Sequence, residues 1–441
     1  MDSAFRCDPM RRTLAITALL ISATTARAQT GIDLSQARAY FTELSQLDSI
    51  DGGKLWGRRV AGPMMFADPA SRTVVANQAD AKGLLRLENG LWIGKLPPEI
   101  SVANTAQNVG GRIFSMIIWP LTDSKYARGR LLMHESFHRI QDSLALPAFN
   151  PGNAHMVSAE SRIWTRLEWR ALTEALLHTG AARKQALTDA LTFRARRSSS
   201  APAAKEEERQ LELNEGLAEY TGLVLSGLPK SALHDRVAVQ LAQAESGESF
   251  SRSFAYASGP AYGLLLDDTG HAWRKRLSSS SDISTLAQNA YGITALDSRN
   301  ADKLVSRYIG ERMVDDERAK ETKRLARENQ LRSMFTSGAR LTLPNAGAFS
   351  FSFNPNAVLP IQSLGTVYNG ARITDAWGIL DAENGTVLIT RDGAGNPGSA
   401  IVAHPTIDGG TVKGDGWKLE LSPGWSLEQG PGGAFTVVKK N

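Results

Sequence analysis

The sequence predicts an α+β protein made of three successive parts. Residues 29–121 contain short apolar or alternating runs, which are typical of strands. Residues 122–335 carry apolar side chains at helical spacing. From Gly338 onward the composition shifts to glycine, threonine, valine, phenylalanine and proline. We therefore expect a β-rich N-terminal lobe, a mainly helical region and a small C-terminal β-sandwich over residues 338–441.

The amino terminus has the features of an export signal. Arg11 and Arg12 precede an apolar run over residues 14–23, and residues 26–28, Ala-Arg-Ala, have the small-x-small form of a signal-peptidase site. We expect residues 1–28 to be a signal peptide that is removed when the protein is exported to the periplasm or secreted. The general secretory route and the twin-arginine route both remain open.

Composition narrows the class of protein. The chain has 441 residues, 42% of them hydrophobic, so it can form a substantial core. The only cysteine, Cys7, precedes the cleavage site, and the processed chain is expected to contain no disulfide. A net charge of +5 is too small to predict nucleic-acid binding. No apolar run after the signal approaches the ~20 residues that span a bilayer, so we expect no stable membrane span.

The N-terminal lobe is expected to begin with a helix over residues 32–48. Residues 88–90, Glu-Asn-Gly, lie between two strand-like runs and predict a tight hairpin turn, because Asn-Gly favours the backbone of a two-residue hairpin loop. The candidate strands of this lobe are residues 64–66, 73–76, 84–87, 91–96 and 113–119.

The most informative motif begins the helical region. Residues 134–138, HESFH, have the form His-Glu-x-x-His that zinc hydrolases use. Residues four apart share one face of a helix, with Cβ atoms roughly 5–6 Å apart, so His134 and His138 can bind one ion. Glu135 is offset around the helix and can approach a metal-bound water as a general base. The alternative is a pair of hydrogen-bonded core histidines.

The flanking sequence favours a helix at this motif. Residues 122–124 offer capping oxygens just after a proline. His134, His138 and Gln141 form one stripe of the expected helix. Beside it lies an apolar stripe, as expected for a buried helix, made of Leu132, Met133, Phe137, Ile140 and Leu144.

A second motif offers the third ligand that a catalytic zinc site requires. Residues 214–220 read Asn-Glu-Gly-Leu-Ala-Glu-Tyr. This segment resembles the second zinc motif of the gluzincins, the thermolysin-like and aminopeptidase-like metallopeptidases whose third ligand is a glutamate. The resemblance implies one zinc ion, Zn²⁺, bound by His134, His138 and Glu215. The fourth position would then be left for water.

The same resemblance implies supporting contacts, with Asn214 on the outer nitrogen of His138 and Glu219 on that of His134. Such contacts fix the tautomer and raise the basicity of the ligands. Independently, leucines make this segment partly buried, and a buried carboxylate requires a compensating cation. The alternative is that these acidic residues form a solvent-exposed helix face, because they recur at helical spacing. The residues concerned are Glu208, Glu212, Glu215 and Glu219.

A donor for the oxyanion is the remaining catalytic requirement, worth about 3–4 kcal/mol beyond the metal. Residues 254–263 contain two tyrosines beside glycines. Their Tyr-x-x-Gly form resembles the tyrosine motif of aminopeptidase-like gluzincins, which implies Tyr256 as the donor. The alternative is that Tyr256 and Tyr262 both pack in the core.

The two motifs are separated by residues 139–214, a longer insert than in the best-known gluzincins. Apolar spacing over residues 160–178 and 181–193 predicts a helical hairpin within it. A basic, serine-rich stretch over residues 194–204 is expected to be an exposed loop, including its arginines, Arg194, Arg196 and Arg197.

These observations together predict an exported zinc-dependent metallopeptidase that hydrolyses peptide bonds in a peptide or protein substrate. The alternative is a secreted binding or scaffold protein whose zinc ion is purely structural. Structural zinc sites are usually closed by four protein ligands. A fourth ligand would favour that alternative, and the candidates are His155, His178, His234 and His271. The sequence specifies neither the cleavage specificity nor the oligomeric state.

Overall fold

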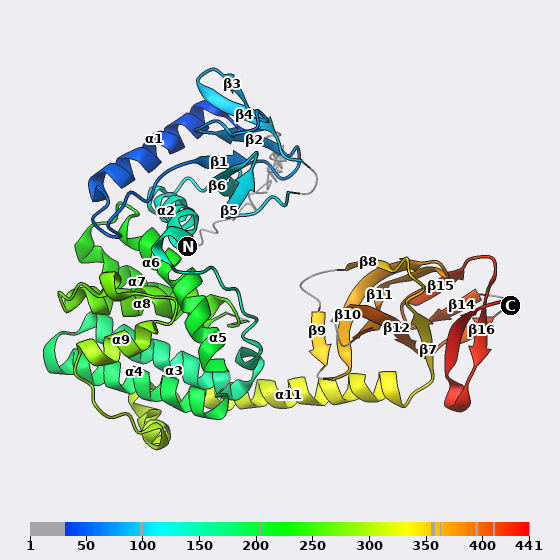
Figure 1. Ribbon diagram of the computed structural model, residues 1–441. Helices are drawn as coiled ribbons and strands as arrows, with labels where there is room; N and C mark the ends of the chain where they lie inside the picture. The colour runs from blue at the N-terminus through cyan, green and yellow to red at the C-terminus, as the bar shows by residue number, and fades with distance from the viewer. Residues whose placement is uncertain are drawn as a thin grey trace, which may run out of the picture.

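The structure is a computed structural model that describes residues 31–440, apart from residues 98–99, 203, 248, 354–357, 362, 393–395 and 409–410. The predicted signal peptide, residues 1–28, lies outside the described residues. The fold is α+β, as the sequence predicts, and Figure 1 shows a β-rich lobe, a helical region and a C-terminal sheet in chain order. Among the described residues, no helix combines the length and apolar character needed to cross a bilayer.

The N-terminal lobe is one helix on a six-stranded sheet. The strands are hydrogen-bonded in the order β3-β4-β2-β1-β6-β5, and β1 and β6 are parallel while the other pairs are antiparallel. The predicted hairpin joins β3 to β4, with positive φ at Asn89 and Gly90. The elements are α1 (Leu34–Asp51), β1 (Met64–Ala67), β2 (Thr73–Ala76), β3 (Arg86–Glu88), β4 (Leu91–Lys95), β5 (Thr105–Val109) and β6 (Arg112–Ile118).

The sheet buries both faces, because alternate residues of a strand point to opposite sides. Met64 and Phe66 join the main core with α1, where the rings of Phe41 and Phe66 stack at 4.6 Å. Met65 and Met116 belong to a separate apolar cluster on the other face. The face that carries Met64 and Phe66 shares its core cluster with α2, the helix that contains residues 134–138.

The helical region contains both zinc motifs. Figure 1 shows α2 beneath the sheet and the remaining helices stacked below it. The α-helices are α2 (Lys125–Gln141), α3 (Ala159–Leu177), α4 (Gly180–Ser200), α5 (Ala204–Leu211), α6 (Leu217–Val224), α7 (Leu233–Glu245), α8 (Ser253–Asp268), α9 (Ile283–Ala290), α10 (Ala301–Leu304) and α11 (Glu311–Thr336). A π-helical turn, η3 (Glu212–Gly216), joins α5 to α6.

The predicted helical hairpin of the insert is present as α3 and α4. The expectation of an exposed loop over residues 194–204 is wrong, because α4 continues to Ser200. Arg194 and Arg197 are 7% and 1% exposed. The helix extends this far because glutamates from three other segments compensate its two buried guanidinium groups.

These glutamates and arginines form a buried ion network. Arg197 donates to Glu168 at 2.6 Å and to both oxygens of Glu208 at 2.9 and 2.7 Å. Arg194 donates to Glu168 at 3.1 Å and to Glu212 at 2.8 Å. Burial raises the pKa of Glu208, but Arg197, His155 and Arg194 together outweigh burial and hold the pKa below its usual range. The network ties the insert to α5 and η3, the segment that leads to Glu215.

The C-terminal region is all-β, and its strands form one hydrogen-bonded sheet that curls over itself (Figure 1). Trp377 and Leu380 are fully buried in the apolar cluster of this region. The strands are β7 (Arg340–Pro344), β8 (Ser350–Phe353), β9 (Val358–Ile361), β10 (Gly365–Asp375), β11 (Gly378–Arg391), β12 (Pro397–Ala403), β13 (Thr406–Asp408), β14 (Thr411–Gly414), β15 (Trp417–Leu421), β16 (Trp425–Gln429) and β17 (Phe435–Lys439).

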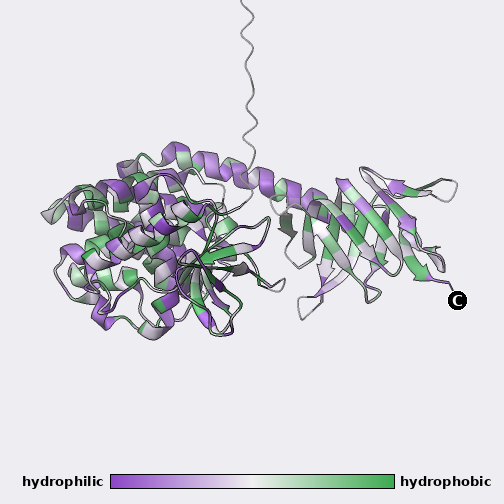
Figure 2. Cartoon of the chain, turned by 90° about the horizontal axis from the view of Figure 1, so that it is seen from above, coloured by the Kyte–Doolittle hydropathy of each residue, from purple (hydrophilic) through white to green (hydrophobic). Residues whose placement is uncertain are grey.

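The long helix α11 connects the helical region to this sheet. Near its start, Glu317 pairs with Arg162 of α3 at 2.6 Å. Near its end, Leu331 and Phe335 pack with residues of the C-terminal sheet. The intervening turns are mainly hydrophilic, as Figure 2 shows, and they carry ion pairs such as that of Glu321 with Arg324.

Candidate metal centre

The two helices that carry the zinc motifs pack closely because glycines lie at their contacts. A Cβ atom at Gly222 of α6 would lie 2.6 Å from the carbonyl oxygen of Arg130 on α2. A Cβ atom at Gly129 of α2 would lie 2.6 Å from the carbonyl oxygen of Ser226. Any larger residue at either position would push the helices apart. This short separation brings both histidines of α2 within reach of Glu215.

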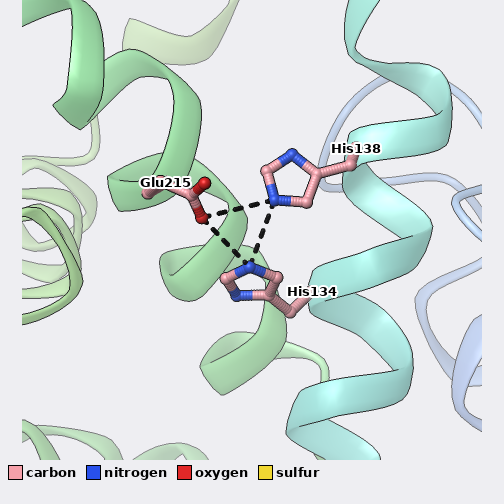
Figure 3. Close-up of side chains that lie close together, drawn as sticks. All are labelled: His134, His138 and Glu215. Atoms are coloured by element: carbon pink, nitrogen blue, oxygen red, sulfur yellow. Dashed lines mark hydrogen bonds and ion pairs between the residues drawn. The ribbon is translucent and has the colours of Figure 1, made fainter. Parts of the chain in front are cut away.

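Figure 3 shows His134, His138 and Glu215 pointing toward one another. The two Nε2 atoms lie 3.2 Å apart, and each lies 3.5 Å from Oε2 of Glu215. In a tetrahedral zinc site with bonds of about 2.0–2.1 Å, neighbouring ligand atoms lie about 3.3–3.4 Å apart. The donor set and its spacing therefore both fit a zinc ion, and among the described residues these three form the group of His and Glu side chains that could hold a metal ion.

The charges of the cluster also favour a cation. Burial raises the pKa of Glu215, but hydrogen bonds with His134 and His138 outweigh it and hold the pKa well below its usual range. Burial lowers the pKa of His134, but hydrogen bonds with Glu215 and Glu219 outweigh this effect and raise the pKa to about 9. The carboxylates thus stabilise a positive charge between them, and a metal competes with protons for the same nitrogens.

Glu135 lies beside this cluster with an unengaged oxygen. The residue is 4% exposed, and its Oε2 has no hydrogen-bond partner among the described residues. Burial raises the pKa of its carboxyl more than His134 and His138 lower it. Its carbonyl oxygen accepts a hydrogen bond from Ser115 of β6 at 2.9 Å, which fixes α2 against the sheet. Glu135 thus lines the same cavity as the three candidate ligands and keeps a free carboxylate oxygen among the described residues.

Glu219 lies behind His134. Its Oε2 is 3.1 Å from Nδ1 of His134. Its other oxygen accepts hydrogen bonds from Arg130 and, at 2.9 Å, from Gln240. This carboxylate directs Nε2 of His134 towards the cluster, since the outer nitrogen is already engaged.

The contact expected between Asn214 and His138 is not formed. Asn214 instead donates its amide to the carbonyl oxygen of Phe149 at 3.0 Å. The outer nitrogen of His138 contacts Oε1 of Gln141 at 3.0 Å. Gln141 takes this place because it lies three residues beyond His138 on the same helix face.

The helix α8 contacts the ligand segment through one face. A Cβ atom at Gly259 would lie 2.3 Å from Cα of Gly216, so the two backbones touch. One turn earlier, Tyr256 donates its hydroxyl to Oε2 of Glu215. One turn before that, Arg252 donates to Oε1 of Glu215 at 2.8 Å. Arg252 is the N-cap residue of α8, and the spacing of the three positions, four and then three residues, is that of a helix face.

The two tyrosines of α8 have different surroundings. The Tyr256 ring stacks on His134 with centroids 5.6 Å apart, and this side chain lines the cavity beside the cluster. Tyr262 is fully buried and donates to Glu168 at 2.7 Å. Of the two tyrosines, therefore, only Tyr256 lies at the candidate metal cluster. Tyr262 packs in the core, as the alternative interpretation expected for both.

The cluster opens into a cavity of about 590 Å³. Residues 103–106 form one wall, and they include the start of β5, one of the two edge strands of the N-terminal sheet. Arg130 and Arg252 line the same cavity. Since the cluster consists of three residues and faces a cavity, space for water and substrate adjoins it.

Of the four histidines that were candidates for a fourth ligand, three have other partners and one is exposed. His155 contacts Glu208 at 2.8 Å, and His234 lies 3.2 Å from Asp268. His178 contacts the carbonyl oxygen of Glu174 at 2.8 Å, and His271 is exposed. None of these four belongs to the metal cluster.

The sequence motifs do not include Arg252, and they give Gln141 no contact with His138. Arg252 is separated from Glu215 by 37 positions, and no local pattern links them. The one indication in the sequence is that Arg252 lies four residues before Tyr256, a spacing that places both side chains on the same helix face. Gln141 lies on the same helix stripe as the two histidines. Its contact with His138 depends on side-chain conformation, which the spacing of the residues does not determine.

No protein-family model, curated protein or solved structure matches this chain.

Proposed function

We propose that this protein is an exported, gluzincin-like zinc metallopeptidase. The observation that carries this proposal is the triangle of ligand atoms from His134, His138 and Glu215, with edges of 3.2, 3.5 and 3.5 Å. A zinc ion fits this donor set, and the adjoining cavity leaves room for a water and a substrate carbonyl.

When bound, a zinc ion supplies a Lewis acid and a water whose pKa is lowered towards neutrality. Glu135 accepts the proton of the attacking water on its unengaged oxygen and passes it to the leaving amine. Tyr256 is the proposed donor to the oxyanion. Because its hydroxyl donates to Glu215, it must exchange that partner as charge develops on the substrate oxygen.

The position of β5 supports a peptide substrate. Edge strands present unpaired N–H and C=O groups, and an extended peptide can pair with them. Residues 103–106 place the start of this strand in the wall of the cavity. A peptide lying along β5 would therefore pass beside Glu135 and the metal ligands.

The alternative, a structural zinc ion in a binding or scaffold protein, has less support. A structural site requires a fourth protein ligand, and the cluster of described residues contains three. Two of the candidate histidines, His155 and His234, are engaged by carboxylates away from the cavity.

Peptide cleavage tests the proposal directly. We expect the purified protein to cleave members of a mixed peptide library, as detected by mass spectrometry. A chelator should stop cleavage, and zinc should restore it. Absence of cleavage by a fully zinc-loaded protein would favour the structural alternative. The same data would distinguish endopeptidase from exopeptidase activity.

A further inference from the structure

The carboxylate of Glu215 is held at both oxygens by residues at the start of one helix. Tyr256 donates to Oε2, and Arg252 donates to Oε1 at 2.8 Å. Tyr256 is in the first turn of α8, and Arg252, four residues earlier, is the residue that precedes this helix. Oε2 is the oxygen that lies 3.5 Å from both histidine Nε2 atoms.

This arrangement makes the two oxygens of Glu215 unequal. The guanidinium group of Arg252 engages Oε1, whereas Oε2 is the oxygen paired with both histidines. Arg252 also donates to Asn150, which lines the same cavity. The backbone contact between Gly216 and Gly259 fixes the separation of the two helices. For Oε1 to reach the ion, Glu215 would have to break a charge-assisted hydrogen bond.

The number of oxygens that Glu215 contributes determines the space left for chemistry. With one oxygen, the protein fills three positions of a tetrahedral site and leaves the fourth for water. A second oxygen from the same carboxylate would crowd or occupy that position. We propose that Arg252 is a positioning residue that restricts Glu215 to one metal-binding oxygen and thereby preserves the water position. This inference rests on the proposed zinc-binding function.

Cobalt substitution tests the inference without relying on activity. The visible spectrum of bound Co²⁺ reports coordination number, since four-coordinate sites absorb more strongly than five-coordinate ones. We expect the full chain to bind one equivalent of Co²⁺ with a four-coordinate spectrum. Arg252→Gln should still bind one equivalent, but its absorption should lose intensity. With zinc, its peptide hydrolysis should fall about 10–100-fold.

Two variants serve as controls. Arg252→Lys keeps a cationic donor and should recover most of the wild-type absorption. Arg236→Gln removes an exposed arginine of the neighbouring helix α7 and should leave the spectrum unchanged. Circular dichroism of the metal-free variants checks their folding. If Arg252→Gln does not fold, the spectrum of Arg252→Lys decides. A small loss of intensity relative to wild type supports the positioning role, because a single flexible ammonium group holds Oε1 less firmly than a guanidinium group, and an unchanged spectrum contradicts it.

The results separate the two proposals. An Arg252→Gln spectrum identical to wild type would overturn the positioning role while leaving the zinc site intact. Complete loss of metal by this variant would also overturn it, because Arg252 would then be needed for binding itself. A wild-type chain that binds no metal would instead refute the proposed function.

Discussion

Two parts of the helical region each bury three glutamates, and they compensate these charges in different ways. In the ion network, Arg194 and Arg197 are almost fully buried and donate to Glu168, Glu208 and Glu212 through several direct hydrogen bonds. At the metal centre, the glutamates face two histidines and a cavity, while the nearby arginines are partly exposed.

The difference shows what makes a buried carboxylate available for chemistry. A guanidinium group satisfies several oxygen lone pairs at once and leaves little room for another ligand. An imidazole engages through single nitrogens, and here two Nε2 atoms and one carboxylate oxygen meet at ion-binding distances. One glutamate of the centre, Glu135, even keeps an oxygen without a partner among the described residues. We infer that the histidines leave the carboxylates of the candidate centre able to bind an ion, although Arg130 and Arg252 also pair with two of them, whereas the fully buried arginines of the ion network leave no such position.

Glu135→Gln should have the largest effect on activity. The amide keeps the size of the side chain but cannot accept the proton, so hydrolysis should fall about 10²–10⁴-fold while one equivalent of zinc is retained. Peptide kinetics together with metal analysis measures both properties. Comparable turnover in the variant would remove Glu135 from the role of base.

Arg197→Met should have the largest effect on stability. It leaves Glu168 and Glu208 buried with part of their compensation lost, at a cost of about 3–5 kcal/mol. Denaturant unfolding measures this loss. Arg196→Met, one residue away on a half-exposed side chain, should cost less than about 1 kcal/mol. Equal losses in the two variants would contradict the distinction between buried and peripheral charges.

Gly259→Ala should disturb the contact between α8 and η3. This turn contains Glu212 of the ion network and Glu215 of the candidate metal centre. The added Cβ would lie 2.3 Å from Gly216, so α8 and the ligand segment must separate, at a cost of about 1–3 kcal/mol. Thermal unfolding and zinc affinity should both decrease. Gly152→Ala, where the added Cβ meets nothing within 4 Å, is the matched control. Unchanged zinc affinity in Gly259→Ala would show that the centre tolerates the displacement.

Glu317 is also paired with arginines, and its contribution to stability should be smaller and should depend on pH. Burial raises its pKa, but Arg162 and Arg166 outweigh burial and hold the pKa below its usual value of 4.5. The ionised carboxylate therefore stabilises the fold above pH 4.5, and this contribution is lost as pH falls through the lowered value. Glu317→Gln should cost about 1–2 kcal/mol at neutral pH and flatten the acid dependence of unfolding. An unchanged acid dependence would exclude this residue as its source.

The sequence predicts the centre well where local spacing determines geometry. His134, Glu135 and His138 are fixed relative to one another by one helix turn, and Glu215 follows from its motif. The α+β class also follows from apolar periodicity. What local spacing could not provide was the pairing between distant segments.

The errors have this common cause. The basic stretch around Arg197 has the composition of an exposed loop, and only the glutamates of α3 and α5 make its burial possible. Asn214 lies in the expected motif, but the carbonyl oxygen of Phe149 engages its amide. Arg252 carries no motif, and its role depends on how α8 packs against Gly216.

Zinc content is the measurement that tests the central claim most directly. After reconstitution and removal of free metal, elemental analysis should find one zinc ion per wild-type chain and per Glu135→Gln chain. Glu215→Ala should bind much less, because one of the three ligand atoms is removed. Less than about one equivalent in the wild type, or the same content in Glu215→Ala, would contradict the account.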